Sequence, residues 1–420
     1  MEDKSRNLLL LVAGWTLWVT GDSSQISIAA LAGKQLAPDW SWSTIPMATQ
    51  FIGAALASIP AALIMGRLGR RAGFMCGSIL AMLGSGLSYY ALTTNSLTLY
   101  MIGTLCIGMF IAFVQLYRFA AAELAPVELK GKFISYVLAG GAIGGLLGPN
   151  LQVWLQSSFA DPAHAGMAHA GMAGMEGMAG MSGILGYRSA YLVYGLVGVL
   201  TLAVMSRLSM DAPPPPPEPK DVRSLGQIAR QPNFVVGALS AIGSFAIMAL
   251  FMAGMTMMME DPSMGHSHHM STLAMSGHYF AMYLPALFVG VLAGRFGANR
   301  IVIMGGALYL VAFLLAMLGD MRAMVPMWTF MILLGAGWSF MFIGGTALVT
   351  RSYKPHERPR AQGLHDFLLF STVALAAYGS GSLFHAKSIG WDNMALIALV
   401  ATAVIIVANV WHQKAGPRPA

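Results

Sequence analysis

Apolar segments recur along the whole chain, and short polar connections separate them. Twelve of these segments are long enough for an α-helix to cross about 30 Å of hydrocarbon, since each residue adds about 1.5 Å. The predicted spans are residues 8–30, 44–66, 73–93, 97–121, 132–154, 187–207, 233–257, 271–293, 299–318, 325–349, 363–384 and 393–412. The pattern therefore predicts an all-α membrane protein with twelve transmembrane helices.

Composition supports this interpretation and excludes other classes of function. Of the 420 residues, 56% are hydrophobic and only 10% are charged, which is typical of a membrane protein. The net charge of +7 does not indicate a nucleic-acid partner, because in a membrane protein the placement of charges carries the information. No Ser–His–acid or phosphate-loop pattern indicates an enzyme. The N-terminal apolar run lacks a small-residue cleavage pattern, so we expect it to be retained as the first span.

Lysine and arginine are distributed unequally between the two sides of the predicted bundle. If the N-terminus is cytoplasmic, the inner side receives Lys4, Arg6, Arg67, Arg70, Arg71, Lys130, Lys132, Arg207, Lys220, Arg223, Arg230, Arg295, Arg300, Arg351, Lys354, Arg358, Arg360, Lys414 and Arg418. The outer side then receives only Lys34, Arg188, Arg322 and Lys387. This bias predicts that both termini are cytoplasmic.

Two loops of the chain repeat at nearly the same offset. The sequence GRLGRR (66–71) after the second span resembles GRFGANR (294–300) after the eighth, at an offset of 228 residues. A Pro-x-Glu sequence after the fourth span recurs after the tenth, at an offset of 229 residues. Two unrelated loops that agree on one offset indicate two six-helix halves in parallel repeat.

The repeat predicts the organisation of the chain into domains. The N-terminal six-helix half occupies residues 1–210 and carries an external Met/His-rich loop, 155–186. The C-terminal half occupies residues 231–420. Residues 211–230 form a cytoplasmic linker, which the run Pro213–Pro217 makes semi-rigid.

Two halves with such a loop after spans two and eight resemble the major facilitator superfamily. In this chain Gly66 and Gly294 replace the acidic residue of that family's loop motif. The fifth span carries Gly144-x-x-x-Gly148-Pro149, which is similar to a reduced form of the family's antiporter motif. The resemblance implies a major facilitator fold, a transport function and a binding site between the halves.

Methionine and histidine are concentrated between Met248 and Met282. Met248 and Met252 lie four residues apart in the seventh span, and His278 and Met282 do so in the eighth, so each pair shares one helix face. Both pairs lie roughly 8–16 Å below the outer surface. Thioethers are soft ligands and imidazole is borderline, which suits Cu(I). A lone methionine is usually packing, but a histidine at membrane depth is costly and indicates function. If the two faces meet, these four side chains form a metal site.

The loops predicted on the outer side contain further soft ligands. Residues 163–181 read AHAGMAHAGMAGMEGMAGM, a glycine-rich run with no core to fill. We expect these loops to collect the metal above the site, although a low-complexity linker is the alternative. The candidate auxiliary ligands are Met255, Met259, His266, His268, His269, His164, His169, Met167 and Met172.

Five polar residues inside the predicted spans are candidates for coupling or gating. They are Asp22, Gln25, Gln115, His365 and Asp366. The alternative is that these residues satisfy one another's hydrogen bonds across a cavity. Arg118 and Glu123, near the inner end of the fourth span, are expected to be structural.

The motifs Met248-x-x-x-Met252 and His278-x-x-x-Met282 resemble those of the CcoA-type copper importers within the superfamily. This resemblance implies copper import across a bacterial plasma (inner) membrane, with copper as the substrate and no permanently bound cofactor. The implied partners are the lipid bilayer and a cytoplasmic copper acceptor, and we expect a monomer. Efflux of copper or of a drug remains an alternative, as does a membrane protein that binds or senses copper without transporting it. The pair Met255 and Met259 is an alternative first motif.

Overall fold

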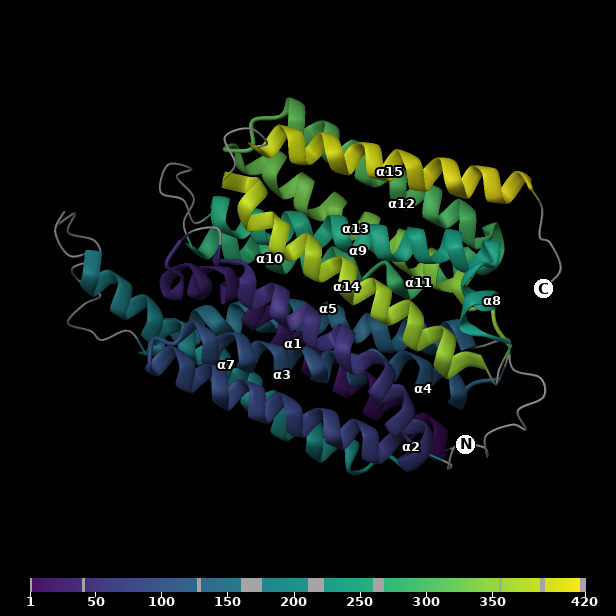
Figure 1. Ribbon diagram of the computed structural model, residues 1–420, viewed down its shortest axis with the longest axis horizontal. Helices are drawn as coiled ribbons and strands as arrows, with labels where there is room; N and C mark the ends of the chain where they lie inside the picture. The colour runs from purple at the N-terminus through teal and green to yellow at the C-terminus, as the bar shows by residue number, and fades with distance from the viewer. Residues whose placement is uncertain are drawn as a thin grey trace.

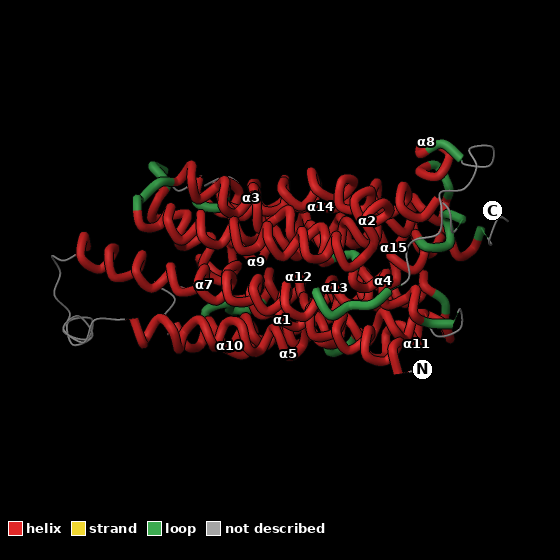
Figure 2. Tube along the Cα trace, turned by 90° about the horizontal axis from the view of Figure 1, so that it is seen from below, coloured by secondary structure: helices red, strands yellow, loops and turns green. Residues whose placement is uncertain are grey.

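The protein is a bundle of long helices that run roughly parallel to its longest axis (Figures 1 and 2). The computed structural model describes residues 2–39, 42–126, 130–159, 176–210, 223–259, 268–354, 357–385 and 390–415. Within these ranges the regular structure is helical, and no strand occurs. Both termini lie at the same end of the bundle (Figure 1).

Each half of the chain contributes six spans. The helices of the N-terminal half are α1 (Glu2–Leu36), α2 (Ile45–Thr93), α3 (Leu97–Val114), α4 (Tyr117–Leu124), α5 (Lys130–Phe159) and α7 (Glu176–Met205). After the short linker helix α8 (Leu225–Ala229), the C-terminal half contains α9 (Pro232–Met259), α10 (His268–Tyr283), α11 (Ala286–Phe296), α12 (Ala298–Leu318), α13 (Met324–Val349), α14 (Arg358–His385) and α15 (Gly390–Lys414).

The number of spans differs from the number of helices, because one helix contains two spans and two pairs of helices each form a single span. By length and composition, nine helical segments of the described residues can cross a membrane, and one of them, Ile45–Thr93, contains two spans. The more polar helices α1 and α14 complete the set. The fourth span consists of α3 and α4, and the eighth consists of α10 and α11. The twelve-helix prediction is thereby confirmed.

The two repeated loops have the same backbone conformation. Gly69, inside α2, has φ +83°, and Gly297, between α11 and α12, has φ +90°. These glycines occupy matching positions of the repeat, and residues with a Cβ rarely adopt this conformation. The turn between two spans is therefore built in the same way in each half.

The halves meet along two seams. At one, α2 packs against α14, and at the other α5 packs against α10 and α11. Glycines allow close approach at the second seam: a Cβ on Gly145 would lie 2.3 Å from that of Tyr279, and one on Gly141 would lie 2.6 Å from the ring of Tyr283. On another face of α5, Gly144 and Gly148 admit the backbone of α1 in the same way. The glycines of the fifth span therefore serve packing on two sides.

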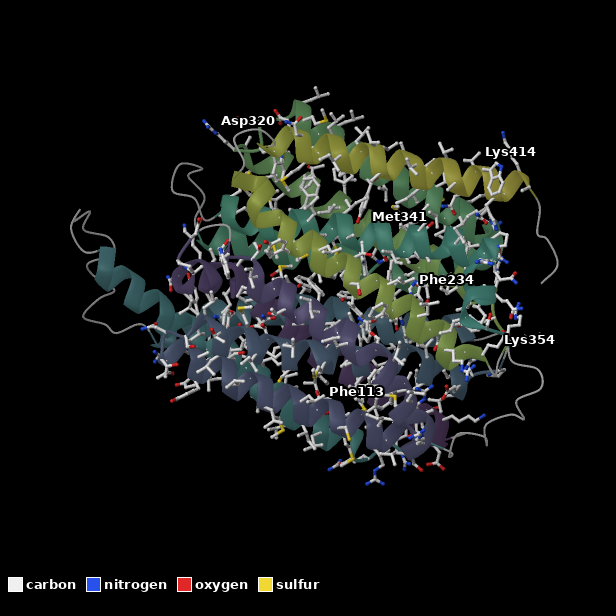
Figure 3. All side chains as sticks on the ribbon, in the orientation of Figure 1. Phe113, Phe234, Asp320, Met341, Lys354 and Lys414 are labelled. Atoms are coloured by element: carbon white, nitrogen blue, oxygen red, sulfur yellow. The ribbon has the colours of Figure 1, made fainter. Side chains whose placement is uncertain are left out.

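The outer surface of the bundle is apolar, as contact with lipid requires. Leu318, Val325 and Leu375 are 84%, 75% and 72% exposed, and exposed apolar surface on this scale marks a membrane-embedded protein. Charged side chains gather at the ends of the helices. Figure 3 shows Lys354 and Lys414 at the end that holds both termini. The structure therefore describes an integral membrane protein.

The linker is attached to the C-terminal half by an ion pair. The Arg223 guanidinium donates to both carboxylate oxygens of Glu357, at 2.8 and 2.6 Å. The backbone N–H of Lys354 donates to the same carboxylate at 2.8 Å. The hydrogen bonds from Arg223 are the main reason that the pKa of Glu357 is lowered from 4.5 to about 2. The end of the linker therefore moves with the C-terminal half.

Candidate functional site

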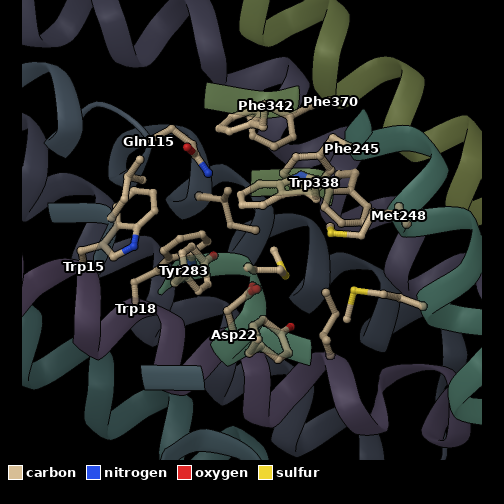
Figure 4. A pocket seen from close by; sticks show the side chains of 18 of the residues that line it. Trp15, Trp18, Asp22, Gln115, Phe245, Met248, Tyr283, Trp338, Phe342 and Phe370 are labelled. Carbon is tan, nitrogen blue, oxygen red and sulfur yellow. The ribbon is translucent and has the colours of Figure 1, made fainter. Parts of the chain in front are cut away.

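A cavity lies at the centre of the bundle, between the two halves. The helices α1, α2, α3 and α5 line it from the N-terminal half, and α9, α10, α13 and α14 line it from the C-terminal half. Its walls are mainly apolar and aromatic, with few polar groups (Figure 4). A central cavity between two repeats is where an alternating-access transporter binds its substrate.

Aromatic rings form a connected wall of this cavity. The ring of Tyr283 lies 6.4 Å from that of Trp15 and 5.9 Å from that of Trp338, in edge-to-face arrangements. Trp338 in turn stacks on Phe342, with the ring centroids 4.7 Å apart. Because Trp15 belongs to α1, this row of rings crosses from one half of the protein to the other. The rings can hold a planar molecule by stacking or a cation by its charge.

Three of the four predicted metal ligands line this cavity. Met248 and Met252 come from α9, and Met282 comes from α10. All three side chains are buried. The helices α9 and α10 make few direct contacts, since α10 packs mainly on α5 and α13, so Met282 belongs to a different wall of the cavity from Met248 and Met252. Met47 of α2 adds a fourth thioether, so the cavity is lined by four thioethers together with the carboxylate of Asp22 and the side-chain amide of Gln115.

His278, the fourth predicted ligand, is placed differently. It is fully buried but does not line the cavity. Its Nδ1 lies 2.8 Å from the backbone carbonyl of Met331 in α13, and its Nε2 has no hydrogen-bond partner among the described residues. The cavity face of α10 consists of Tyr279, Met282 and Tyr283 instead. The prediction that His278 shares a site with the three methionines stays a prediction.

Two of the predicted coupling residues, Asp22 and Gln115, line the cavity (Figure 4). Asp22 lines the wall from α1, and its Oδ1 accepts a hydrogen bond from Gln50 Nε2 at 3.0 Å. Gln25, one turn further along α1, is fully buried away from the cavity, with its Nε2 3.5 Å from the Tyr191 hydroxyl. Asp22 and Gln25 therefore have different surroundings although they lie in one helix.

His365 and Asp366 lie close to Arg118 rather than in the cavity. The His365 Nδ1 is 3.0 Å from an Asp366 carboxylate oxygen, and Arg118 lies 3.5 Å from that oxygen. Arg118 belongs to α4 and Asp366 to α14, so this buried ion pair joins the two halves. We expected Arg118 to be structural and did not expect a contact with Asp366.

The auxiliary ligands are only partly described by the structure. Met255 and Met259 are buried in α9 but do not line the cavity. His268 and His269 begin α10, and their side chains lie outside the described residues. The remaining auxiliary residues lie wholly outside the described residues, namely His164, His169, Met167, Met172 and His266. In the described part of the chain, no group of three or more His, Cys, Asp or Glu residues could hold a metal ion.

The aromatic wall is the part of the site that the sequence did not predict. The aromatic residues are spread over the whole chain, and nothing in their spacing shows that they converge. One local signal was available, since Tyr279 and Tyr283 are four residues apart and flank Met282 on the helix surface.

An apolar bundle of twelve spans with a central cavity between two repeats defines a membrane transporter. The sequence matches the Major Facilitator Superfamily over residues 16–265 and 238–419, and the chain belongs to this family. Because this family consists of transporters, the chain is neither an enzyme nor a membrane protein that only binds or senses copper.

Known relatives match almost the full length of the chain. The riboflavin transporter RfnT of Brucella anthropi is 31% identical over 412 residues, which cover 97% of this chain and 96% of that protein. The uncharacterized MFS-type transporter YddS of Bacillus subtilis is 26% identical, over 97% of this chain and 91% of that protein. The substrate named for RfnT is an organic molecule and not a metal ion.

Solved structures share the fold. The fucose:proton symporter FucP of E. coli superimposes with a TM-score of 0.70 at 15% identity, over 98% of this chain and 99% of that one. The human organic anion transporter MFSD10 superimposes with a TM-score of 0.68 at 13% identity, over 98% of this chain and 99% of that one. At these identities the likeness establishes the fold alone.

Proposed function

We propose that this protein imports copper into the cytoplasm by alternating access, and that Met248, Met252 and Met282 bind the ion in the central cavity. The observation that carries the proposal is that three of the four thioethers lining the cavity between the halves are predicted ligands, and that they come from two helices. Thioethers favour Cu(I) over hard cations, and two to four such ligands satisfy it. A neutral set of ligands also allows the ion to leave again, as transport requires.

His278 is a further ligand in this proposal. Its Nε2 is buried without a hydrogen-bond partner among the described residues. The imidazole would join Met282 at the cavity only in a conformation in which α10 is rotated relative to α13. We therefore assign His278 a role in one stage of the transport cycle rather than in every conformation.

The sequence indicates the direction of transport. The Met/His-rich segments lie in loops that the charge bias predicts on the outside. An exporter would need its collecting ligands on the cytoplasmic side. The charge bias also predicts that the ion is released at the end of the bundle that holds both termini (Figure 1), where a cytoplasmic copper acceptor would receive it. We expect one chain to suffice.

Copper uptake into proteoliposomes tests this function. Radiolabelled Cu(I) should accumulate with the wild-type protein, and Met282→Leu should reduce the rate by about tenfold or more, since leucine fills a similar volume without a sulfur ligand. Met47→Leu is the matched control, because Met47 lines the same cavity from α2 outside the proposed ligand set. Unchanged uptake in both Met248→Leu and Met282→Leu would refute the metal site.

Transport of a planar aromatic molecule is the second candidate. Two observations favour it: the row of aromatic rings in the cavity and the 31% identity to a riboflavin transporter. The same proteoliposomes, supplied with radiolabelled riboflavin, distinguish the candidates. Accumulation of riboflavin without accumulation of copper would favour the aromatic substrate, and Trp338→Leu should then abolish the uptake.

A further inference from the structure

The charge of the central cavity is set by one side chain. Of the described residues that line the cavity, Asp22 is the only one with a formally charged group. It is 9% exposed, and no lysine, arginine or histidine of the described residues forms an ion pair with it. A carboxylate in such surroundings lacks the countercharge that buried ions usually have.

The carboxylate is held in position by the N-terminal half. Gln50 of α2 donates to its Oδ1 at 3.0 Å, and Gln50 is itself fully buried. This hydrogen bond orients the carboxylate but supplies no positive charge. The buried guanidinium of Arg118 forms its ion pair with Asp366 instead. The cavity therefore combines one acidic group from the N-terminal half with the three proposed thioether ligands from the C-terminal half.

We propose that the Asp22 carboxylate is the countercharge for a monovalent soft cation in the cavity. This inference rests on the proposed function and adds a residue to it. The methionines supply soft but neutral ligands, so by themselves they leave the ion's charge uncompensated. With Asp22 ionised in the same cavity, the loaded cavity carries no net charge. A loaded transporter that is neutral can change conformation without working against the membrane potential.

In the same arrangement a bound ion would link the two halves. Asp22 belongs to α1 and the methionines to α9 and α10, so an ion between them touches both repeats. Without a cation in the cavity the Asp22 carboxyl has no countercharge, and a bound cation would supply it. Occupancy therefore favours the conformation in which both sets of groups are close together.

Silver(I) is a suitable probe, because it is soft, monovalent and stable in air. In purified protein, Asp22→Asn should weaken silver binding by on the order of 100-fold, which corresponds to the roughly 3 kcal/mol cost of removing one partner of a buried ion pair. Asparagine keeps the shape of the side chain and an acceptor for Gln50. Asp22→Glu, which keeps the charge, is the matched control and should bind within about tenfold of wild type.

Exchange of radiolabelled silver across proteoliposomes at an imposed potential tests the charge itself. In this assay only the loaded transporter changes conformation, so exchange by the wild type and by Asp22→Glu should not depend on the potential. In Asp22→Asn the loaded cavity is positive, and 100 mV should shift its conformational equilibrium by up to about 50-fold.

The outcomes separate this inference from the proposed function. If the wild type binds silver and Asp22→Asn binds it equally well with exchange that ignores the potential, the role of Asp22 is refuted and the copper function stands. If the wild type neither binds nor transports silver or copper, the copper function fails and this inference fails with it. Thermal unfolding of each variant shows whether the fold is intact before the assays are compared.

Discussion

Gly69 and Gly297 illustrate, at the scale of single residues, how the backbone of a repeat is specified. Both have a positive φ, and both lie where one span ends and the next begins. A Cβ added to either would meet no atom within 4 Å. Space therefore cannot be the reason for glycine at these positions, and the backbone conformation is the physical reason that remains.

Gly297→Ala should lower the free energy of unfolding by about 1–3 kcal/mol, the usual cost of a backbone conformation reserved for glycine. The measurement is the thermal unfolding midpoint in detergent. Gly294→Ala is the control, because it also has open space around its Cβ but lies in α11 with ordinary helical φ. The control should be neutral or slightly stabilising. Equal midpoints for the two variants would contradict the explanation.

The ion pair of Glu357 should make the stability of the protein depend on pH in a defined way. Hydrogen bonds from Arg223 lower the pKa of this carboxyl from 4.5 to about 2, so folding favours the ionised form. The stability that the ion pair contributes is complete above about pH 4.5 and is lost as the pH falls toward about 2. The difference in unfolding midpoint between wild type and Glu357→Gln should therefore be constant from about pH 8 to about pH 5, and shrink below about pH 4.

The conservative variant Arg223→Lys separates charge from geometry in this interaction. Lysine keeps the charge but not the two parallel hydrogen bonds to Glu357. We expect an intermediate midpoint with the same direction of pH dependence. A midpoint for Glu357→Gln that changes in step with the wild type at all pH values would exclude the ion pair as the cause.

The element that positions the cavity wall is α5. Its glycines let α1 approach on one side and let Tyr279 and Tyr283 of α10 approach on the other. Both tyrosines line the cavity, so the spacing of glycines in one helix determines where the side chains of another lie. Small residues at helix contacts in membranes allow such close packing.

Gly145→Ala should therefore impair both stability and uptake. The added Cβ would lie 2.3 Å from that of Tyr279, an atom too close to its backbone to move aside. We expect a loss of about 1–3 kcal/mol in the free energy of unfolding and slower uptake of substrate. Gly277→Ala in α10 is the control, since its Cβ would meet no atom within 4 Å. Normal uptake by Gly145→Ala would show that the tyrosines tolerate displacement.

At the scale of the whole molecule, ion pairs join the halves near the end that holds both termini. Arg118 and Asp366 form a buried pair at 3.5 Å, and the more exposed Glu123 lies 3.8 Å from Arg358. Each pair joins α4 to the region of α14. A transporter that alternates between two conformations must break such contacts when this end opens.

Asp366→Asn should destabilise the protein by about 3–5 kcal/mol, because it leaves the Arg118 guanidinium buried and uncompensated. The double variant Arg118→Gln/Asp366→Asn should recover part of this loss, and thermal unfolding measures both. Arg358→Gln is the control, since its half-exposed pair should contribute no more than about 1 kcal/mol. Additive losses in the double variant would mean that the two residues do not interact.

The sequence by itself determined the membrane class, the twelve spans and the repeat. Apolar length is a local property, and the two loop sequences carry the repeat without any help from packing. The sequence also predicted the methionines as a group, because their spacing in α9 is that of one helix face. In such cases the physical cause lies within about 20 neighbouring residues.

Only the tertiary structure decided which residues face the cavity. The helices are apolar all round, so their sequences do not indicate which way each one is rotated. His278 and Met282 are one turn apart, yet Met282 lines the cavity while His278 contacts α13. The rotation of α10 is set by its packing on α5 and α13. For the same reason Asp22 comes to line one cavity with the methionines of α9 and α10, and Arg118 pairs with Asp366, only when the two halves come together.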